Sequence, residues 1–274
     1  MSDVALGVGR RRRGIRGTLA RLGFSARRRA RFALMLAALT WGVIREAARP
    51  SSWRRTVRAE FGRALRQAVS GGVMPVLVTA ALIGIAMVSQ ALYWIEESGQ
   101  SALLGPVIVT VLMREIAPVL VGLILLGRSG MVAVSEIGAL QLGGQVRALE
   151  AQGLDPFQIL LLPRATALAL ASFTLGMVFV VASLLTGFMV GSVVGAVKLS
   201  LFSFLDSVLL ALHPPDFVAL PAKLMLIGLL VALSAGLTGL TARPRDDAAT
   251  LLPRGFVRGV LAVLFASIVL SLVV

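Results

Sequence analysis

The 274-residue sequence contains no cysteine and only one histidine, His213. The lack of cysteine excludes disulfide bonds and thiolate metal sites, and a single histidine excludes most zinc and haem centres. No G-x-x-x-x-G-K-[S/T] motif occurs, so the chain does not carry its own P-loop ATPase. Charged residues are scarce at 15%, against about 25% in soluble domains. Because 57% of the residues are hydrophobic, a water-soluble globular fold and a disordered chain are also excluded.

Long continuous apolar runs favour an all-α integral membrane protein over a β-barrel, whose strands alternate in polarity. Five transmembrane helices are predicted, at 73–95, 103–126, 165–197, 217–240 and 256–274. The third run is too short for two spans and a turn, so we expect one long tilted helix. Residues 200–212 are expected to form a helix along the outer interface. Lys223 lies near the outer end of its span, where it is expected to snorkel.

The net charge of +14 is concentrated at the N-terminus. Residues 1–70 hold 17 of the 27 Lys and Arg residues and three of the 13 acids. Residues 1–31 are predicted to be a basic disordered tail that contacts anionic lipid head groups rather than nucleic acid. Residues 32–72 are predicted as an interfacial amphipathic segment, with a basic helix at 51–69. The five-span domain then occupies 73–274.

The distribution of arginine predicts the topology. Loops at 127–164 and 241–258 are rich in arginine, whereas the opposite side of the membrane carries only Lys198. Since Lys and Arg accumulate on the cytoplasmic side, both termini are assigned: N-terminus inside, C-terminus outside.

Two charged residues, Arg114 and Glu115, fall in the middle of the second predicted span. Each costs about 2.5–3.5 kcal/mol at the centre of a bilayer, so each needs protein or water around it. Adjacent residues on a helix point about 100° apart and do not form a simple pair with each other. Two interpretations stay open: each charge pairs with another helix and fixes packing, or Glu115 lies on a polar pathway.

The polar segment 127–158 is predicted to lie in the cytoplasm. Ser135 is expected to cap a short helix, Gly153 to end a helix, and Asp155-Pro156 to begin the next one. A short helix between two spans is well placed to dock into a soluble partner, through the apolar residues Leu140, Val146 and Leu149 with Glu136 and Arg147 at the rim. The alternative is a solvated connector.

Glycines at 187, 191 and 195 recur every four residues in an apolar helix. This spacing is typical of close helix packing. Either packing within the chain or a homodimer seam would explain Gly187, Gly191 and Gly195, and packing within the chain is favoured because five helices must pack in each subunit.

Several short motifs occur in order along the chain. They are Arg114-Glu115-x-x-Pro118, Gly127-Arg128-x-Gly130, Glu136-Ile137-Gly138, Gln145-x-x-Ala148-Leu149, Gly153-x-Asp155-Pro156 and Pro163-Arg164, with Gly84 and Gln90 before them. Over about 75–195 the sequence resembles the MlaE-type permease family, and its C-terminal third is similar in topology only. The last span lacks polar residues usual in that family. Ala117 stands where glycine is usual, and Gly143-Gly144 and Arg147 also depart from the family pattern.

The resemblance implies a non-catalytic permease subunit of an ABC system in the bacterial cytoplasmic (inner) membrane. It implies a homodimer that moves phospholipid or a related lipid, with a cytoplasmic ABC ATPase that binds the ATP and an MCE-domain protein on the outer face. The permease itself would need no cofactor. Residues implied on the lipid path are Arg114, Glu115 and Gln90. Residues implied in ATPase coupling are Glu136, Gly138, Leu140, Gln145, Val146, Arg147, Leu149 and Asp155.

Two other functions remain alternatives. An ion- or proton-coupled carrier would use Arg114 and Glu115 and would be active without an ATPase. A non-transporting membrane scaffold would recruit partners through its basic tail.

Overall fold

The computed structural model describes residues 27, 31–88, 90, 91, 93, 104–193, 200–244 and 246–273. The chain divides into two units, Met1–Gly42 and Val43–Val274. In the first unit, residues 31–42 are helical, and the Thr40 hydroxyl donates to the carbonyl of Leu36 at 2.8 Å. Apart from Arg27 and Arg31, the predicted basic tail lies outside the described residues.

The second unit contains five helices long and apolar enough to cross a membrane. They are Arg55–Val88, Ile108–Leu142, Phe157–Val193, Asp216–Leu240 and Ala248–Leu272. No strand occurs among the described residues. The predicted all-α fold with five transmembrane helices is therefore confirmed.

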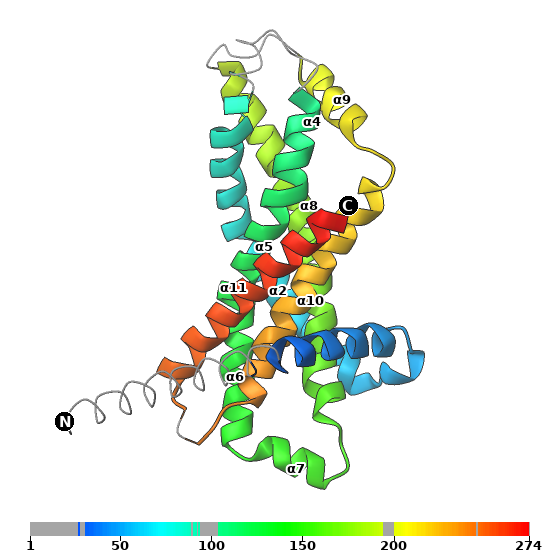
Figure 1. Ribbon diagram of the computed structural model, residues 1–274, viewed down its shortest axis with the longest axis vertical. Coiled ribbons are helices and arrows are strands. Elements are labelled where there is room, and N and C mark those ends of the chain that lie inside the picture. Colours follow the sequence, from blue (N-terminus) through cyan, green and yellow to red (C-terminus); the bar gives the residue numbers. More distant parts are fainter. Residues whose placement is uncertain are drawn as a thin grey trace, which may run out of the picture. The chain divides into compact units, whose positions relative to one another are not determined.

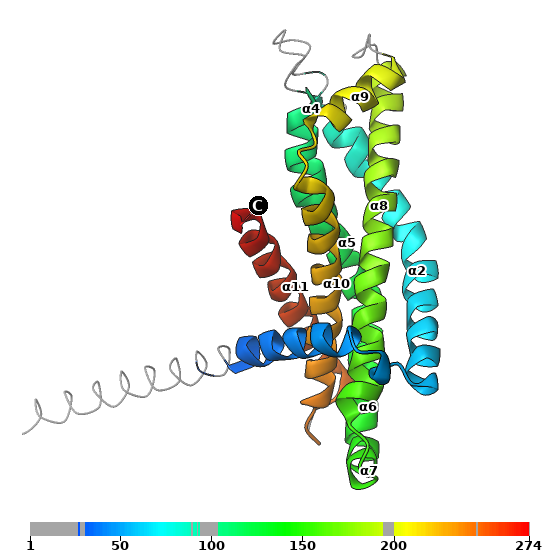
Figure 2. The same ribbon diagram turned by 90° about the vertical axis from the view of Figure 1, so that its right-hand side faces the viewer.

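Three of these helices contain wide π-helical turns. The first joins α2 (Arg55–Ile83) to η2 (Gly84–Val88), and the third joins η6 (Phe157–Leu161) to α8 (Leu162–Val193). The second consists of α4 (Leu104–Val107), η4 (Ile108–Ile116), α5 (Ala117–Leu125), η5 (Leu126–Gly130) and α6 (Met131–Leu142). From Pro50 onward, the remaining helices are η1 (Pro50–Ser52), α7 (Gln145–Ala151), α9 (Leu201–Ala211), α10 (Asp216–Leu240) and α11 (Ala248–Val273). Figures 1 and 2 show α7 and α9 at opposite ends of the bundle.

Residues 55–69 of the basic segment and the first span form one continuous helix, α2, and not two. Gly71 and Gly72 lie inside this helix and do not interrupt it. Side chains of neighbouring helices occupy the space that a larger residue would fill at either position. A Cβ atom on Gly72 would lie 2.6 Å from Leu175 of α8, and one on Gly71 would lie 2.3 Å from the Arg128 guanidinium. The glycine pair therefore permits close packing and does not mark a helix boundary.

The second helix is also longer than predicted. It continues through 127–142, which was expected to be part of a cytoplasmic connection, and runs unbroken from Leu104 to Leu142. Ser135 therefore lies inside α6 and caps no helix. At 1.5 Å per residue the helix is about 58 Å long, so it extends well beyond a hydrocarbon core of about 30 Å.

The local signals that follow α6 are confirmed. Gly153 ends α7 in the left-handed region (φ 74°), and the N–H of Leu154 donates to the carbonyl of Leu149 at 3.0 Å. This is the Schellman arrangement that glycine favours at helix ends. Asp155 caps the third long helix, because its Oδ1 accepts from the N–H of Phe157 at 2.9 Å.

The third span is a single helix through Val193, as predicted, and Ser200 caps α9 by accepting from the N–H of Ser203. The loop before the last helix is shorter than the predicted 241–255, because α11 begins at Ala248. Pro253 therefore lies within α11, which is possible in a membrane helix when neighbouring groups satisfy the freed backbone.

The last helix packs antiparallel along the second helix through interlocking glycines. A Cβ on Gly138 of α6 would meet Leu251 at 2.6 Å, and one on Gly122 would meet Ile227 at 2.5 Å and Val263 at 3.2 Å. In the other direction, a Cβ on Gly259 of α11 would meet Leu126 at 2.2 Å. These contacts hold α11 close to the helix that carries the membrane-embedded charges.

Candidate functional site

Arg114 is paired with an aspartate at the start of α10. Its Nη2 donates to Oδ2 of Asp216 at 2.7 Å and lies 2.7 Å from Oδ1. The side chain of Asp216 is 1% exposed, and its Oδ2 also accepts from the backbone N–H of His213 at 2.9 Å. This ion pair fastens the second long helix to the N-terminus of α10.

Lys223 does not snorkel to the interface, because its side chain is 8% exposed and hydrogen-bonded inside the bundle. Its Nζ donates to the carbonyl of Arg114 at 2.6 Å and to Oγ of Ser271 at 2.7 Å, and lies 3.3 Å from Oε1 of Glu115. Pro118 explains the first contact. A proline has no N–H for the carbonyl four residues earlier, so the Arg114 carbonyl is available to another donor.

Glu115 is the most accessible of these charges, with 45% of its side chain exposed. Its Oε1 accepts from the Ser271 hydroxyl at 2.5 Å, on the last helix. Both Arg114 and Glu115 belong to η4, a nine-residue π-helical stretch. Such wide turns are rare and concentrate at functional sites.

The charge cluster is Arg114, Glu115, Asp216 and Lys223, and its charges sum to zero. It lines a hollow of about 540 Å³, counting the space at the open mouth, together with Thr110, Ala219, Leu220, Leu270 and Ser271. Arg114 and Glu115 lie within the predicted second span, but the helix that carries them runs on beyond that span to Leu142. Arg114 therefore lies about 15 Å along the helix from Leu104 and nearer to that end than to Leu142.

The cluster joins three helices, and each predicted charge has a partner on another helix. That geometry supports the packing interpretation for Arg114. Glu115 combines both interpretations, since it is hydrogen-bonded yet half exposed at the hollow. Gln90, the other predicted residue of the lipid path, is exposed and does not line this hollow. No group of three or more potential metal ligands occurs among the described residues.

A protein-family model, Permease MlaE, matches residues 61–273. The chain belongs to the MlaE permease family. The match includes the C-terminal third, where only a similarity in topology was predicted.

Three curated relatives illustrate this membership. Protein TRIGALACTOSYLDIACYLGLYCEROL 1, chloroplastic, of Arabidopsis thaliana is 29% identical over 60% of this chain and 47% of that protein. A probable ABC transporter permease protein of Rickettsia prowazekii is 32% identical over 50% and 52%. The intermembrane phospholipid transport system permease protein MlaE of Haemophilus influenzae is 26% identical over 49% and 53%. The chain spans about half the length of these relatives.

In this MlaE family member, the predicted coupling residues are divided between the interior and the surface. Val146 is buried, Leu140 and Leu149 are half buried, and Gln145, Arg147 and Asp155 are exposed. Gly138 is packed against Leu251, and Glu136 forms an ion pair with Arg164 of α8 at 2.7 Å. Val146 and Gly138 are therefore structural within the chain. The exposed leucines at this end are Leu142 (45% exposed) and Leu154 (38%), neither of which was predicted as an anchor.

Two of the three glycines predicted to allow close packing, Gly187 and Gly191, belong to the described residues, and both are packed within the chain. A Cβ on Gly187 would lie 2.3 Å from Cβ of Val88 and 2.5 Å from the carbonyl oxygen of Gly84. Gly191 is buried, and Gly195 lies outside the described residues.

The sequence analysis missed two residues of the charge cluster, Asp216 and Lys223, and the neighbouring Ser271. Asp216 directly follows a Pro-Pro pair and opens an apolar run, which could have marked it as a buried acid at a helix start. Lys223 is the only charged residue in the predicted span 217–240, a signal that was assigned to snorkelling. Ser271 carries no sequence signal, since serine is common in membrane helices.

Proposed function

We propose that this chain is the permease subunit of an ABC-type transport system that moves phospholipids or related lipids. Family membership supports a transport role, and the name of the Haemophilus influenzae relative refers to phospholipid transport. The observation that carries the proposal is Glu115, a half-exposed carboxylate at a membrane-embedded hollow whose other charges are neutralised. An amphiphile requires such a mixed surface, polar at one point and apolar around it.

In the proposed assembly the permease is a homodimer in the bacterial inner membrane, with its N-terminus inside and its C-terminus outside. A separate ABC ATPase binds and hydrolyses ATP and docks at the α7 end. An MCE-domain protein extends the lipid path at the opposite end. The permease is not an enzyme and needs no cofactor of its own.

The fold suggests how energy would reach the cluster. α6 carries α7 and is continuous with η4, which carries Glu115. α11 packs against this one long helix at Gly138 and is hydrogen-bonded to Glu115 through Ser271. A shift of α6 driven by the ATPase would therefore move α11 and change the hydrogen bond between Ser271 and Glu115. Lipid tails would occupy apolar surface between the two protomers.

The test is lipid movement by the permease and its ATPase in reconstituted vesicles. Glu115→Arg is expected to abolish ATP-dependent transport while the protein still inserts and dimerises, because it reverses the charge at the hollow. Glu115→Gln is the matched variant: it keeps the shape and a hydrogen-bond acceptor for Ser271, and is expected to fold normally.

Wild-type transport by Glu115→Arg would contradict the role of Glu115. Loss of folded protein in both variants would indicate that Glu115 only stabilises the packing of the helices. Ion flux through the permease without its ATPase would instead support a coupled carrier.

A further inference from the structure

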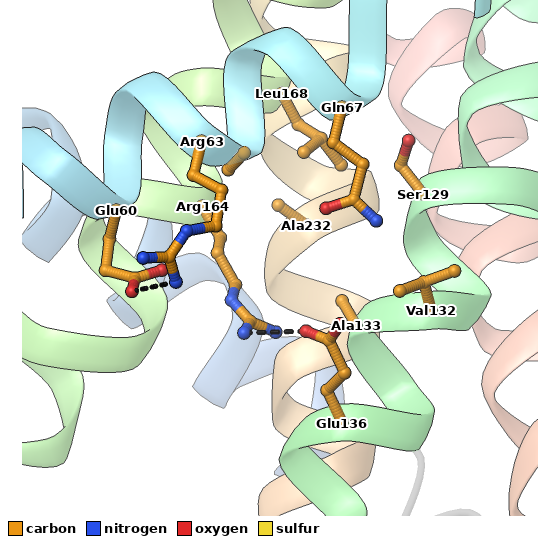
Figure 3. Close-up of a pocket in the computed structure, with 11 residues that line it drawn as sticks. Glu60, Arg63, Gln67, Ser129, Val132, Ala133, Glu136, Arg164, Leu168 and Ala232 are labelled. Carbon is orange, nitrogen blue, oxygen red and sulfur yellow. Dashed lines mark hydrogen bonds and ion pairs between the residues drawn. The ribbon is translucent and has the colours of Figure 1, made fainter. Parts of the chain in front are cut away.

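A second hollow lies toward the α7 end of the bundle, away from the charge cluster. Its polar lining comes from α2, η5, α6 and α8: Glu60, Arg63, Gln67, Ser129, Glu136 and Arg164. Leu168 of α8 and Ala232 of α10 add apolar surface. It encloses about 590 Å³, counting the space at its open mouth. Figure 3 shows the arginine and glutamate side chains gathered on one side of it.

The sequence places this hollow at the level of the lipid head groups. In α2 no charge follows Arg66 before the end of the span, and in α8 Arg164 is the last charge before Lys198. In the second helix, Arg128 is the first charge after Glu115. All three helices thus change from charged to apolar beside the hollow, as helices do where they leave the hydrocarbon core.

The charges in the hollow balance one another. Arg63 pairs with Glu60 at 2.6 Å and Arg164 pairs with Glu136 at 2.7 Å (Figure 3). Arg164 uses Nη2 for this pair, and its buried Nη1 has no hydrogen-bond partner in the described part of the chain. A guanidinium with a donor to spare suits a phosphate oxygen, and the two carboxylates suit an ammonium group.

We propose that this hollow binds the head group of a zwitterionic phospholipid that carries a primary ammonium group. The phosphate would lie against Arg164, and the ammonium group against Glu60 and Glu136. Leu168 and Ala232 would line the beginning of the acyl chains. An anionic lipid fits less well, because the carboxylates repel its uncompensated charge. The role of this lipid as cargo rests on the proposed function, whereas its binding does not.

The test is photo-crosslinking of the full-length protein with a photoreactive amino acid at position 67. The purified protein is placed in mixed micelles holding equal amounts of phosphatidylethanolamine and phosphatidylglycerol with identical acyl chains. Phosphatidylethanolamine is expected to be captured about tenfold more than phosphatidylglycerol, the effect of one charge-assisted contact. Combining Glu60→Gln with Glu136→Gln should abolish this preference, because the arginines are then free to bind an anionic lipid.

The matched control combines Glu150→Gln with Asp247→Asn, which removes the same charge outside the hollow and should leave the preference unchanged. Ser129→Trp fills the hollow without altering charge and should lower capture of both lipids. Equal capture by the wild type, or an unchanged preference in the Glu60 and Glu136 variant, would overturn the proposal.

Displacement of the lipid by an equal concentration of glycerophosphoethanolamine would also overturn it, because the site would then take a soluble head group. A lack of ATP-dependent transport would contradict the proposed function but would leave the crosslinking result intact, so the two failures can be distinguished.

Discussion

The ammonium group of Lys223 donates to the backbone carbonyl of Arg114 at 2.6 Å, four residues before Pro118. The proline removes the N–H that an α-helix would offer this carbonyl, and a side chain from α10 replaces it. One lysine thus satisfies a backbone acceptor and helps to neutralise Glu115. The Arg114-Glu115-x-x-Pro118 motif and Lys223 therefore form one structural unit, although they lie more than a hundred residues apart.

Lys223→Met is expected to lower the free energy of unfolding by about 2–4 kcal/mol, because it leaves a buried carbonyl unpaired and removes a cation from the cluster. Pro118→Ala restores an N–H that can donate to Arg114, so the double variant should be more stable than the sum of the single effects predicts. A double-mutant cycle of unfolding in detergent micelles measures this coupling. Strictly additive effects would show that Pro118 does not set the role of Lys223.

The cluster shows what a single sequence can and cannot predict. The cost of placing Arg114 and Glu115 in a membrane indicates that they need partners, and both have them. The sequence does not identify those partners, because Asp216 and Lys223 become neighbours only when α10 packs beside the second helix. Lys223 lies close enough to a span end that snorkelling and burial were both physically reasonable.

The helix ends were likewise predicted only in part. Gly153 and Asp155 were predicted correctly, because a helix stop and a cap depend on local backbone chemistry. A helix at 51–69 was predicted, but its continuity with the first span was missed. The continuation of the second helix through 127–142 was also missed, because hydropathy locates the part of a helix that crosses the membrane and not the part that projects beyond it. Polar residues there, such as Glu136, are stabilised by partners on other helices.

Gly187→Ala is expected to lower the stability of the protein by about 1–3 kcal/mol without changing its oligomeric state. The added methyl group would meet Cβ of Val88 and the carbonyl oxygen of Gly84, which cannot yield as a flexible side-chain tip would. Gly62→Ala is the matched control, since nothing lies within 4 Å of its Cβ position, and alanine should stabilise that helix slightly. Unfolding and light scattering of both variants measure the two effects. A loss of dimers with unchanged stability would instead place Gly187 at a seam between subunits.

The loop between α10 and α11 is expected to lose order only in acid. Hydrogen bonds from Arg254, and then from the N–H of Arg243, hold the pKa of Asp246 below its ordinary value of 3.8. A lowered pKa means that the contribution of Asp246 is fully present above that ordinary value and is lost as the pH falls through the lower pKa. Protection of the Arg243 amide from hydrogen exchange should therefore be constant from pH 7 to pH 5.

Protection should decrease below about pH 3.8 in the wild type. Asp246→Ala removes the acceptor of the Arg243 N–H and should already be unprotected at pH 7, whereas Asp247→Asn should behave like the wild type. A decrease centred near pH 6 would point to a group other than Asp246.

Coupling to an ATPase is predicted at the α7 end, through Leu142 and Leu154. Both leucines are exposed beside α7, whereas no large hydrophobic residue is exposed among the described residues of 241–255. A docked helix is held by a few apolar anchors surrounded by polar residues, and losing one central anchor costs about 2 kcal/mol, or about thirtyfold in affinity. Leu154→Asp should therefore release the ATPase and stop lipid movement without disturbing the five spans.

Leu149→Asp should also lower the affinity for the ATPase, but it should destabilise α7 as well, because Leu149 is half buried. Val146→Asp should destabilise the permease itself, since Val146 is 5% exposed. Leu210→Asp is the matched control: that leucine is 78% exposed on α9, at the other end of the bundle, and its variant should retain the ATPase. Copurification of the ATPase with each variant is the measurement. If Leu142→Asp and Leu154→Asp retain the ATPase at the wild-type level while a change within 241–247 releases it, the coupling contact lies in that loop and not at α7.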